Sequence, residues 1–465
     1  MNLILIILSG ILYIIPFFNP NLYLISWIAL IPFLYSLKKS NYKKIFYQAW
    51  LLGFIIMLGV GYPLYFPIKS FSDFPSFLVT LLLVLLFALL SIIYGLWGKV
   101  YKIIEKKNNF NPLLFSLTWF GLEIIRHIIL NFFPLGYLGY TQANFNQIIQ
   151  LADLGGVFLV SFIIVLINTL IFKFIVTQNK KYVIISVLII ILVLSYGFYQ
   201  INRYQKIEQS LKVGIIQTNN NQKEKWLRSN ISKFNELLIN NDPIFNNIDL
   251  IITPESALTF DINKEQGYRD EILEKISEQN KYYQIGFLAS KNNEKRYYNS
   301  SFLISPEGKI EERYDKNKLV LFGEYVIFSD LIEKLTGYRL NTLKAGKEIE
   351  TFQTKFADWK TVICSEILYP EYVAKDAVQL DLIVNQSNEA WFKNNQTLKN
   401  QMFASLVFRA VENRRSIIKA GNMTYSGIVY PSGQRKKLDN KLNREVLGIK
   451  RNHKKTILSY LLNIF

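Results

Sequence analysis

The sequence predicts a polytopic α-helical membrane bundle followed by an α/β domain. Long apolar runs are confined to roughly the first 200 residues, as expected for a chain that groups its apolar residues into membrane spans. From residue 206 onward, short apolar runs alternate with polar helix-like stretches, which is typical of an α/β domain. We therefore expect a membrane bundle over 1–205, an α/β domain over 206–450 and a short basic and apolar tail over 451–465.

Composition limits the kinds of site that the chain can hold. The formal net charge is +18 over 465 residues, and many lysines lie between apolar runs, which indicates a topology signal rather than nucleic-acid binding. The single cysteine, Cys364, excludes a cysteine-rich zinc site, and two histidines, His127 and His453, disfavour histidine-dependent nucleophilic catalysis. The sequence shows no metal, nucleotide or nucleic-acid motif, so we expect no cofactor, no metal and no nucleic-acid partner.

Seven apolar segments approach the length of about 20 residues that a membrane-spanning helix needs. They are 3–18, 22–37, 46–66, 76–98, 112–130, 154–176 and 182–200. The first segment has no basic flank before it and no small-residue cleavage site after it. We therefore expect it to be a retained anchor rather than a signal peptide.

The distribution of lysines predicts how the bundle is oriented. The loops 38–44 and 99–109 and the region 173–181 are rich in lysine, whereas 19–21 and 67–75 carry almost no net charge. Positively charged loops face the cytoplasm. The N-terminus is then cytoplasmic, and an odd number of spans places the α/β domain on the opposite side of the membrane.

The segment 131–162 is aromatic, rich in glycine and nearly uncharged, and it lies between two predicted spans. It is either an interfacial loop with an aromatic belt or a re-entrant, lipid-lining element over the site. Glu123, Arg126 and His127 are the charged or polar exceptions in the apolar segment just before it. Ionisable residues inside a membrane are functional candidates, unless these three lie at a helix end.

The second half predicts buried strands with covering helices. The candidate strands are 212–219, 249–256, 283–290, 298–305, 360–366 and 381–388. The candidate amphipathic helices between them include 223–240 and 396–415.

Three residues with chemical potential lie at or near the ends of these runs. Glu255 and Cys364 each end an apolar run, and Lys316 lies in the charged stretch ERYDKNK. Catalytic groups commonly follow strands in α/β folds. Singly, each has a structural interpretation: a buried apolar cysteine, a capping glutamate and a solvated lysine. Lys318 competes with Lys316, because two residues apart in a strand share a face.

Eight segments, in this order along the chain, match the motifs of a known family. They are FPLGYLGYTQ (133–142), GGVFLVSF (155–162), VGIIQTNNNQKEKW (213–226), TPESAL (253–258), YDKNKLVLFGEYV (314–326), ICSE (363–366), NQSNEAWF (385–392) and RAVENRRSIIKA (409–420). The chain resembles the carbon–nitrogen hydrolase (nitrilase) superfamily and, within it, is similar almost end to end to the apolipoprotein N-acyltransferase family. The resemblance implies a nitrilase-like αββα sandwich with a Glu–Lys–Cys triad, beside the membrane bundle.

The resemblance also implies an acyltransferase reaction in two steps. Cys364 would take an acyl chain from a phospholipid, typically phosphatidylethanolamine, and the α-amine of an S-diacylglyceryl-cysteine lipoprotein would then accept it from the thioester. With no suitable histidine, Glu255 is the expected general base. Lys316 would favour the thiolate and stabilise the tetrahedral oxyanion, helped by a backbone N–H near Ser365.

Other family positions suggest supporting residues and a location. Glu324 and Glu366 would support the triad or act as structural ion pairs, and Trp391 and Phe392 would line the acyl path or belong to the core. The resemblance places the protein in the bacterial cytoplasmic (inner) membrane as a multi-pass protein, with its catalytic domain on the periplasmic side. The apolar end of the tail, 456–465, is too short to cross a bilayer.

Several positions depart from the family pattern and leave pocket shape open. Thr253, Lys318, Leu321, Ser365 and Glu389 replace the usual tryptophan, histidine, proline, aromatic residue and aspartate. Two other functions remain as alternatives: a membrane-anchored nitrilase-like amidase or hydrolase, and an inactive membrane scaffold or transporter. An anchored hydrolase would need one helix rather than seven, and an inactive domain would not need the complete triad.

Overall fold

The computed structural model describes residues 2–38, 40–71, 74–108, 110–221, 224–229, 231, 234, 236, 245–291, 296–320, 323–325, 334, 342–348, 350–393, 395–438, 444–452 and 455–462. They form two compact units. The first comprises Met1–Gln205, Asn394–Glu412 and Thr456–Leu458, and the second comprises Lys206–Lys393, Asn413–Lys455 and Ser459–Phe465. Residues 394–412, which the sequence analysis grouped with the α/β domain, therefore belong to the first unit.

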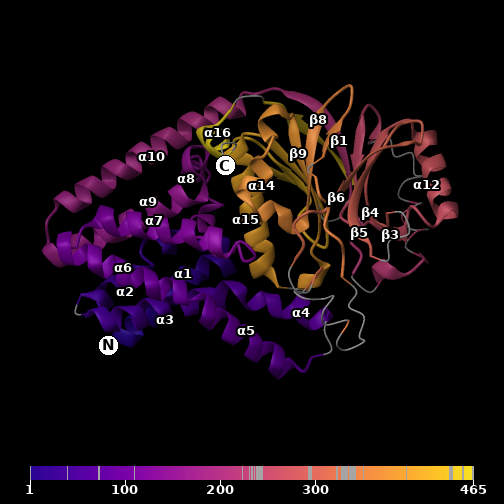
Figure 1. The fold of residues 1–465 in the computed structure, drawn as a ribbon. Helices are drawn as coiled ribbons and strands as arrows, with labels where there is room; N and C mark the ends of the chain where they lie inside the picture. The colour runs from indigo at the N-terminus through magenta and orange to yellow at the C-terminus, as the bar shows by residue number, and fades with distance from the viewer. Residues whose placement is uncertain are drawn as a thin grey trace. The chain divides into compact units, whose positions relative to one another are not determined.

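The first unit is a bundle of apolar helices (Figure 1). Its α-helices are α1 (Asn2–Phe18), α2 (Ile31–Leu37), α3 (Tyr42–Gly61), α4 (Tyr65–Phe71), α5 (Ser76–Leu90), α6 (Ile92–Asn108), α7 (Pro112–Ile129), α8 (Asn146–Ile149), α9 (Ala152–Thr177), α10 (Lys181–Gln205) and most of α15 (Gln396–Asn413). Its 3₁₀ helices are η1 (Pro20–Trp27), η2 (Tyr62–Leu64) and η3 (Leu138–Gln142). The predicted helix over 396–415 is confirmed as α15, with its contacts made to the bundle.

Six helical segments within the described residues are long and apolar enough to cross a membrane. They are Pro20–Leu37, Tyr42–Ser70, Ser76–Glu105, Pro112–Ile129, Ala152–Thr177 and Lys181–Gln205. Six of the seven predicted spans are therefore recovered, and the chain is a multi-pass membrane protein. The remaining segment forms α1, whose 17 residues extend only about 25 Å against a hydrocarbon core of about 30 Å.

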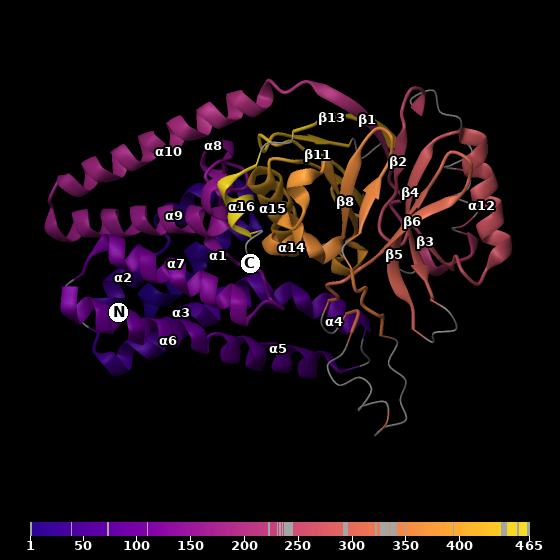
Figure 2. The ribbon, with the colours of Figure 1, turned by 45° about the horizontal axis from the view of Figure 1, so that its top comes forward.

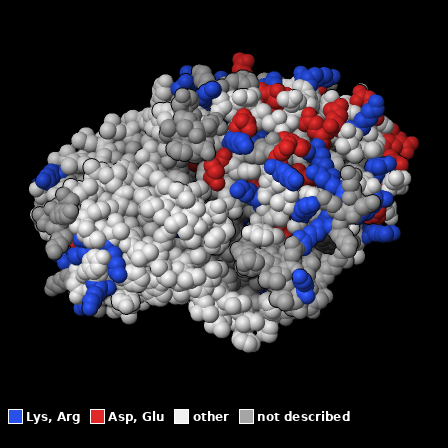
Figure 3. Space-filling view, in the orientation of Figure 1, with Lys and Arg blue, Asp and Glu red and all other residues white. Residues whose placement is uncertain are grey.

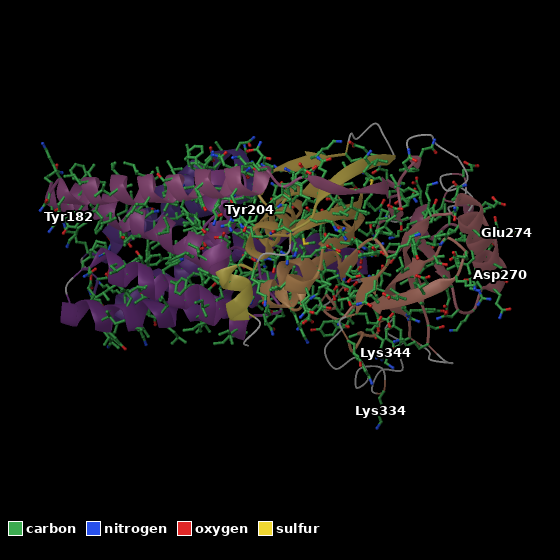
Figure 4. The ribbon with its side chains drawn as sticks, turned by 90° about the horizontal axis from the view of Figure 1, so that it is seen from above. Tyr182, Tyr204, Asp270, Glu274, Lys334 and Lys344 are labelled. Atoms are coloured by element: carbon green, nitrogen blue, oxygen red, sulfur yellow. The ribbon has the colours of Figure 1, made fainter. Side chains whose placement is uncertain are left out.

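The outer faces of the bundle are apolar, as lipid contact requires. Figure 4 shows α10 running between Tyr182 and Tyr204, and its Ile184, Leu188 and Leu192 are among the exposed large apolar side chains. The visible face of the bundle in Figure 3 carries few charged side chains, and those that it carries gather at one end. This pattern is the reverse of a soluble surface.

The segment 133–142 is buried inside the bundle, as irregular backbone up to Tyr137 and then as the 3₁₀ helix η3. Its main-chain groups bind side chains: the N–H of Leu138 donates to Glu123 Oε1 at 3.0 Å, and the Tyr13 hydroxyl donates to the Gly136 carbonyl at 2.9 Å. Gln401 of α15 accepts the Gly136 N–H at 3.0 Å. Non-helical backbone is tolerated at membrane depth only when its polar groups are satisfied. Burial of Tyr137 and its neighbours contradicts an exposed aromatic belt; a lipid-lining role stays a prediction.

The second unit contains two mixed β-sheets. The first has the order β13-β1-β2-β4-β5-β6, with β3 beside β4, and the second has the order β12-β11-β10-β9-β8-β7. Their strands are β1 (Gln209–Ile216), β2 (Leu250–Ile252), β3 (Leu258–Asp261), β4 (Tyr282–Ala289), β5 (Tyr298–Ile304), β6 (Ile310–Asp315), β7 (Thr351–Gln353), β8 (Asp358–Ile363), β9 (Leu382–Asn388), β10 (Ser416–Asn422), β11 (Gly427–Val429), β12 (Arg435–Lys437) and β13 (Arg444–Lys450). Each of the six predicted strands overlaps an observed one, β1, β2, β4, β5, β8 or β9, but β2 covers only three of the eight residues expected over 249–256.

The two sheets pack face to face with helices outside them (Figure 2). Across the interface, Gln284 of β4 donates to Thr361 of β8 at 2.8 Å, and the Trp359 indole donates back to Gln284 at 2.9 Å. Helix α12 (Gln266–Gln279) buries Ile272 and Ile276 in the apolar core under the first sheet. Helix α14 (Pro370–Ala374) lies beside the second sheet, where Lys360 of β8 bonds the Tyr372 carbonyl. The αββα sandwich is confirmed.

Two predicted elements are only partly described. The helix expected over 223–240 begins with the 3₁₀ turn η4 (Glu224–Trp226), and most of its remainder lies outside the described residues. The tail contains a six-residue helix, α16 (Ile457–Leu462), consistent with its being too short to span. Leu321 and His453 lie outside the described residues.

Candidate active site

Cys364 lies in a strained turn directly after β8. Its φ is +52°, a left-handed conformation that is uncommon for any residue except glycine. The turn continues as η6 (Cys364–Leu368), and the N–H of Ile363 donates to Glu366 Oε2 at 2.7 Å. The side chain is 8% exposed. Backbone strain of this kind clusters at functional sites.

Glu255 follows β2 and is buried, and both of its carboxylate oxygens accept hydrogen bonds. Oε1 accepts a hydrogen bond from Asn299 Nδ2 at 2.6 Å, and Oε2 accepts the main-chain N–H of Asn388 at 2.6 Å. Lys316 Nζ lies 3.7 Å from Oε1. The carboxylate is therefore fixed in position from three elements, β5, β9 and the end of β6.

Lys316 follows β6 and is 1% exposed. Its ammonium lies 2.7 Å from Glu324 Oε1, and its main-chain N–H donates to the Asn299 carbonyl at 2.9 Å. Burial alone would lower the pKa of Lys316, but the carboxylates of Glu324 and Glu255 outweigh it and raise that pKa above its ordinary value. Lys316 is therefore a permanent cation at physiological pH.

Lys318, the competing lysine, lies in a different environment. It is exposed, and its ammonium sits over the ring of Tyr369 at 5.7 Å from the centroid. Because β6 ends at Asp315, Lys316 and Lys318 do not occupy one strand face. The structure therefore brings Lys316, and not Lys318, to Glu255.

Glu255 and Lys316 lie 3.7 Å apart, and the charges of both act on the pKa of the Cys364 thiol. Burial raises the pKa of Cys364 well above its usual value; Glu255 raises it further, and Lys316 lowers it. The resting side chain is then a neutral thiol. A neutral thiol can act as a nucleophile only if a base takes its proton at the moment of attack.

Glu366 holds two parts of the site together. Besides Ile363, it accepts the main-chain N–H groups of Asn317 at 2.7 Å and Lys318 at 3.0 Å, together with the Tyr314 hydroxyl at 2.7 Å. One buried carboxylate thus fixes both the Cys364 turn and the chain just after Lys316.

The remaining predicted site residues are placed as follows. Ser365 is the partly buried residue that follows Cys364 in η6. Trp391 and Phe392 lie in η8 (Ala390–Phe392) and are partly exposed, so neither is a core residue. Thr253 is fully buried, and its carbonyl accepts from Gln386 at 2.7 Å.

Sequence reasoning did not single out several residues that contact the site. Asn299 donates to Glu255 and, at 3.3 Å, to Glu324 Oε1. Lys225 donates to the Glu255 carbonyl at 2.9 Å. Lys419 pairs with Glu389, and both are buried. Asn299 lies in the predicted strand 298–305 and Lys225 in the motif 213–226, but neither stretch marks the individual residue as part of a site. Within the described residues, no group of three His, Cys, Asp or Glu side chains is arranged to hold a metal.

Two family matches together cover most of the chain. Residues 9–170 match the apolipoprotein N-acyltransferase N-terminal domain, and residues 212–440 match carbon-nitrogen hydrolase. Similarity to full-length relatives runs through both. The chain belongs to the apolipoprotein N-acyltransferase family. It is therefore an acyltransferase, as the sequence predicted, and its second unit is a nitrilase-like domain.

Named relatives of this family match over nearly the whole chain. The apolipoprotein N-acyltransferase of Geobacter metallireducens is 28% identical, covering 92% of this chain and 85% of the relative. That of Aquifex aeolicus is 29% identical, covering 92% and 93%. Among solved structures, an amidase from Nesterenkonia sp. is 13% identical, covering 53% of this chain and 94% of the amidase with a TM-score of 0.41.

Proposed function

We propose that this acyltransferase moves a fatty acyl chain from a phospholipid to the α-amine of the S-diacylglyceryl-cysteine of lipoproteins, through a Cys364 thioester. The names of its relatives support the lipoprotein acceptor. The observation that carries the mechanism is the joint burial of Glu255, Lys316 and Cys364 in one unit. The membrane-spanning helices support a donor and an acceptor that both reside in a bilayer.

In the first step, the Cys364 sulfur attacks the ester carbonyl of the phospholipid. Glu255 takes the thiol proton, and the Lys316 ammonium stabilises the oxyanion, with the N–H at Ser365 as a second donor. The tetrahedral intermediate collapses with cleavage of the ester C–O bond. The lysophospholipid leaves with the proton from Glu255, and a neutral thioester remains on the enzyme.

In the second step, the free α-amine of the acceptor attacks the thioester carbonyl. An amide C–N bond forms and the C–S bond breaks. Glu255 accepts the proton that the amine loses and returns it to the departing thiolate, so the enzyme is restored. A thioester suits this step because an amine attacks it readily. Glu255, fixed in position, is the general base in both steps of the reaction.

We further propose that the catalytic domain lies on the periplasmic side of the bacterial inner membrane. Support comes from the regular alternation of lysine-rich and nearly neutral loops. The proposal counts α1 as a seventh crossing beside the six long apolar segments, because only an odd number separates a cytoplasmic N-terminus from the catalytic domain.

The direct test is a lipopeptide assay. The purified full chain is incubated with phosphatidylethanolamine micelles and a synthetic S-diacylglyceryl-cysteine peptide, and the products are identified by mass spectrometry. We expect N-acylated peptide and lysophospholipid in equal amounts, and neither with Cys364→Ala. An acceptor whose α-amine is already acetylated is the matched control and should give no product. Accumulation of free fatty acid without acylated peptide would contradict the proposal and indicate a hydrolase.

A further inference from the structure

Lys225 is a buried lysine whose side chain reaches the main chain of the general base. It lies in η4, is 4% exposed, and its ammonium donates to the Glu255 carbonyl at 2.9 Å. Its own backbone is held on both sides: its N–H donates to Asn221 at 3.1 Å, and its carbonyl accepts from Thr259 of β3 at 3.1 Å. The position of the ammonium is therefore set by the fold.

The buried carboxylates that act on the pKa of Cys364 outnumber the ammonium groups that form ion pairs with them. Three carboxylates act on the thiol, those of Glu255, Glu324 and Glu389. Lys419 pairs with Glu389, whereas within the described part of the chain Glu255 and Glu324 both form their ion pairs with Lys316. The set then carries one surplus negative charge, in a buried site where the reaction must form a further negative charge on sulfur or oxygen. Burying uncompensated charge of one sign opposes that step.

We propose that Lys225 is a positioning residue of the active site, which fixes Glu255 through its carbonyl and supplies the third positive charge around Cys364. Lys225 then joins Lys316 and Lys419 as a third buried ammonium group that faces one of these three carboxylates. This assignment rests on the proposed function, because it gives Cys364 the role of nucleophile. It adds a residue that acts through Glu255 and through its charge, without touching the reacting atoms.

The protonation of Lys225 is compatible with this role. Burial lowers the pKa of Lys225 to about 8, while the charges of Glu255 and Cys364 act in the opposite direction and raise it. The ammonium is therefore mostly charged at pH 7. Formation of the thiolate would strengthen that charge, because each of the two groups favours the ionised form of the other.

A matched control exists in the same unit. Lys360 of β8 is also fully buried, also bonds main-chain carbonyls, those of Tyr372 and Lys375, and burial likewise lowers its pKa to about 8. It differs in facing Glu366 and Asp376 rather than Cys364. A variant of Lys360 therefore reports the general effect of removing a buried lysine.

The test measures thiolate formation directly, by the rate at which iodoacetamide alkylates Cys364 in the full-length protein. At pH 7 we expect Lys225→Met to slow alkylation about tenfold and to move its pH midpoint up by about one unit, since one pKa unit is a tenfold change. Lys225→Arg, which keeps the charge, should stay within about twofold of wild type, as should Lys360→Met. Thermal unfolding of each variant is recorded alongside.

Three results would overturn the assignment. Unchanged alkylation in Lys225→Met would leave the residue a purely structural one. Equal slowing in Lys225→Arg would exclude the charge as the cause, and equal slowing in Lys360→Met would make the effect one of stability. Alkylation needs no acyl donor or acceptor, so its rate can be interpreted even if the lipopeptide assay gives no product. The lipopeptide assay likewise tests the proposed function whatever the role of Lys225.

Discussion

Lys316 and Lys318 are two residues apart, yet only Lys316 is buried against the carboxylates of the site. We expect Lys316→Met to reduce the rate of acyl-enzyme formation by about 10²–10³-fold, the usual effect of removing one oxyanion-stabilising group. Lys318→Met is the matched control and should stay within about threefold, because an exposed lysine contributes little. Rapid-quench measurement of the acylated fraction gives both rates. Equal losses in the two variants would contradict the placement.

The Asn299 side-chain amide donates hydrogen bonds to the carboxylates of both Glu255 and Glu324. A negative charge at this position should therefore be more harmful than the loss of the side chain. Replacing Asn299 with aspartate keeps the size but turns the donor into a third carboxylate facing the other two. We expect Asn299→Asp to lower the rate of acyl-enzyme formation more than Asn299→Ala does, and to do so increasingly as the pH rises through the range where the new carboxyl ionises. An alanine variant slower than the aspartate variant would indicate that shape dominates.

At the scale of single residues, dense and ordered motifs singled out Glu255, Lys316 and Cys364, and all three are buried in the second unit. The sequence did not single out Asn299 or Lys225. Each of these reaches Glu255 across 30 or more positions of the chain, and neither amide nor ammonium is unusual for its local stretch. Their roles come from tertiary placement, which no local pattern encodes.

The turn after β8 and the chain after β6 are two elements joined by Glu366. In Glu366→Gln, one carboxylate oxygen becomes an amide that faces N–H donors. We expect a loss of about 2–4 kcal/mol in unfolding free energy, since buried N–H groups lose their acceptor, and a fall in acyl-enzyme formation. Thermal unfolding and rapid-quench rates measure the two effects.

Glu274 provides the control for that variant, because it lies on the exposed side of α12 (Figure 4). Glu274→Gln should change neither the stability nor the rate. Wild-type behaviour in Glu366→Gln would mean that the Cys364 turn holds its left-handed conformation without the carboxylate.

At the scale of elements, two of the strands that the sequence did not predict, β6 and β10, carry charged side chains. Strand β6, which precedes Lys316, reads IEERYD and is half exposed, so it lacks the apolar run by which the other strands were predicted. Strand β10 contains Lys419 in a fully buried run, where the lysine is accepted only because Glu389 pairs with it. Burial of a charge beside its partner is a tertiary property.

The whole molecule has six long apolar segments and a 17-residue α1, so the side of the catalytic domain depends on whether α1 crosses. In a Cys364→Ala background, Asn280→Cys places one thiol on the exposed end of α12, and Thr177→Cys places one in the lysine-rich 173–181 region. We expect a membrane-impermeant maleimide to label the first in intact cells and the second only after permeabilisation. The reverse pattern would put the catalytic domain in the cytoplasm.

For the whole molecule, grouping of apolar runs was enough to predict a bundle beside an α/β sandwich. It did not show that α15 packs with the bundle, because its sequence is amphipathic in the ordinary way of a sandwich helix. Its polar Asn400 and Gln401 instead bond main-chain carbonyls of α1 and α3. Only the structure reveals partners that are more than 300 residues away.

The central claim is that Cys364 carries the acyl chain, and intact-mass analysis of the protein after incubation with phosphatidylethanolamine tests it most directly. We predict a mass increase of one fatty acyl chain in the wild type, removed by hydroxylamine as thioesters are, and no increase in Cys364→Ala. A wild-type protein that gains no acyl chain, although iodoacetamide still alkylates its Cys364, would contradict the thioester mechanism.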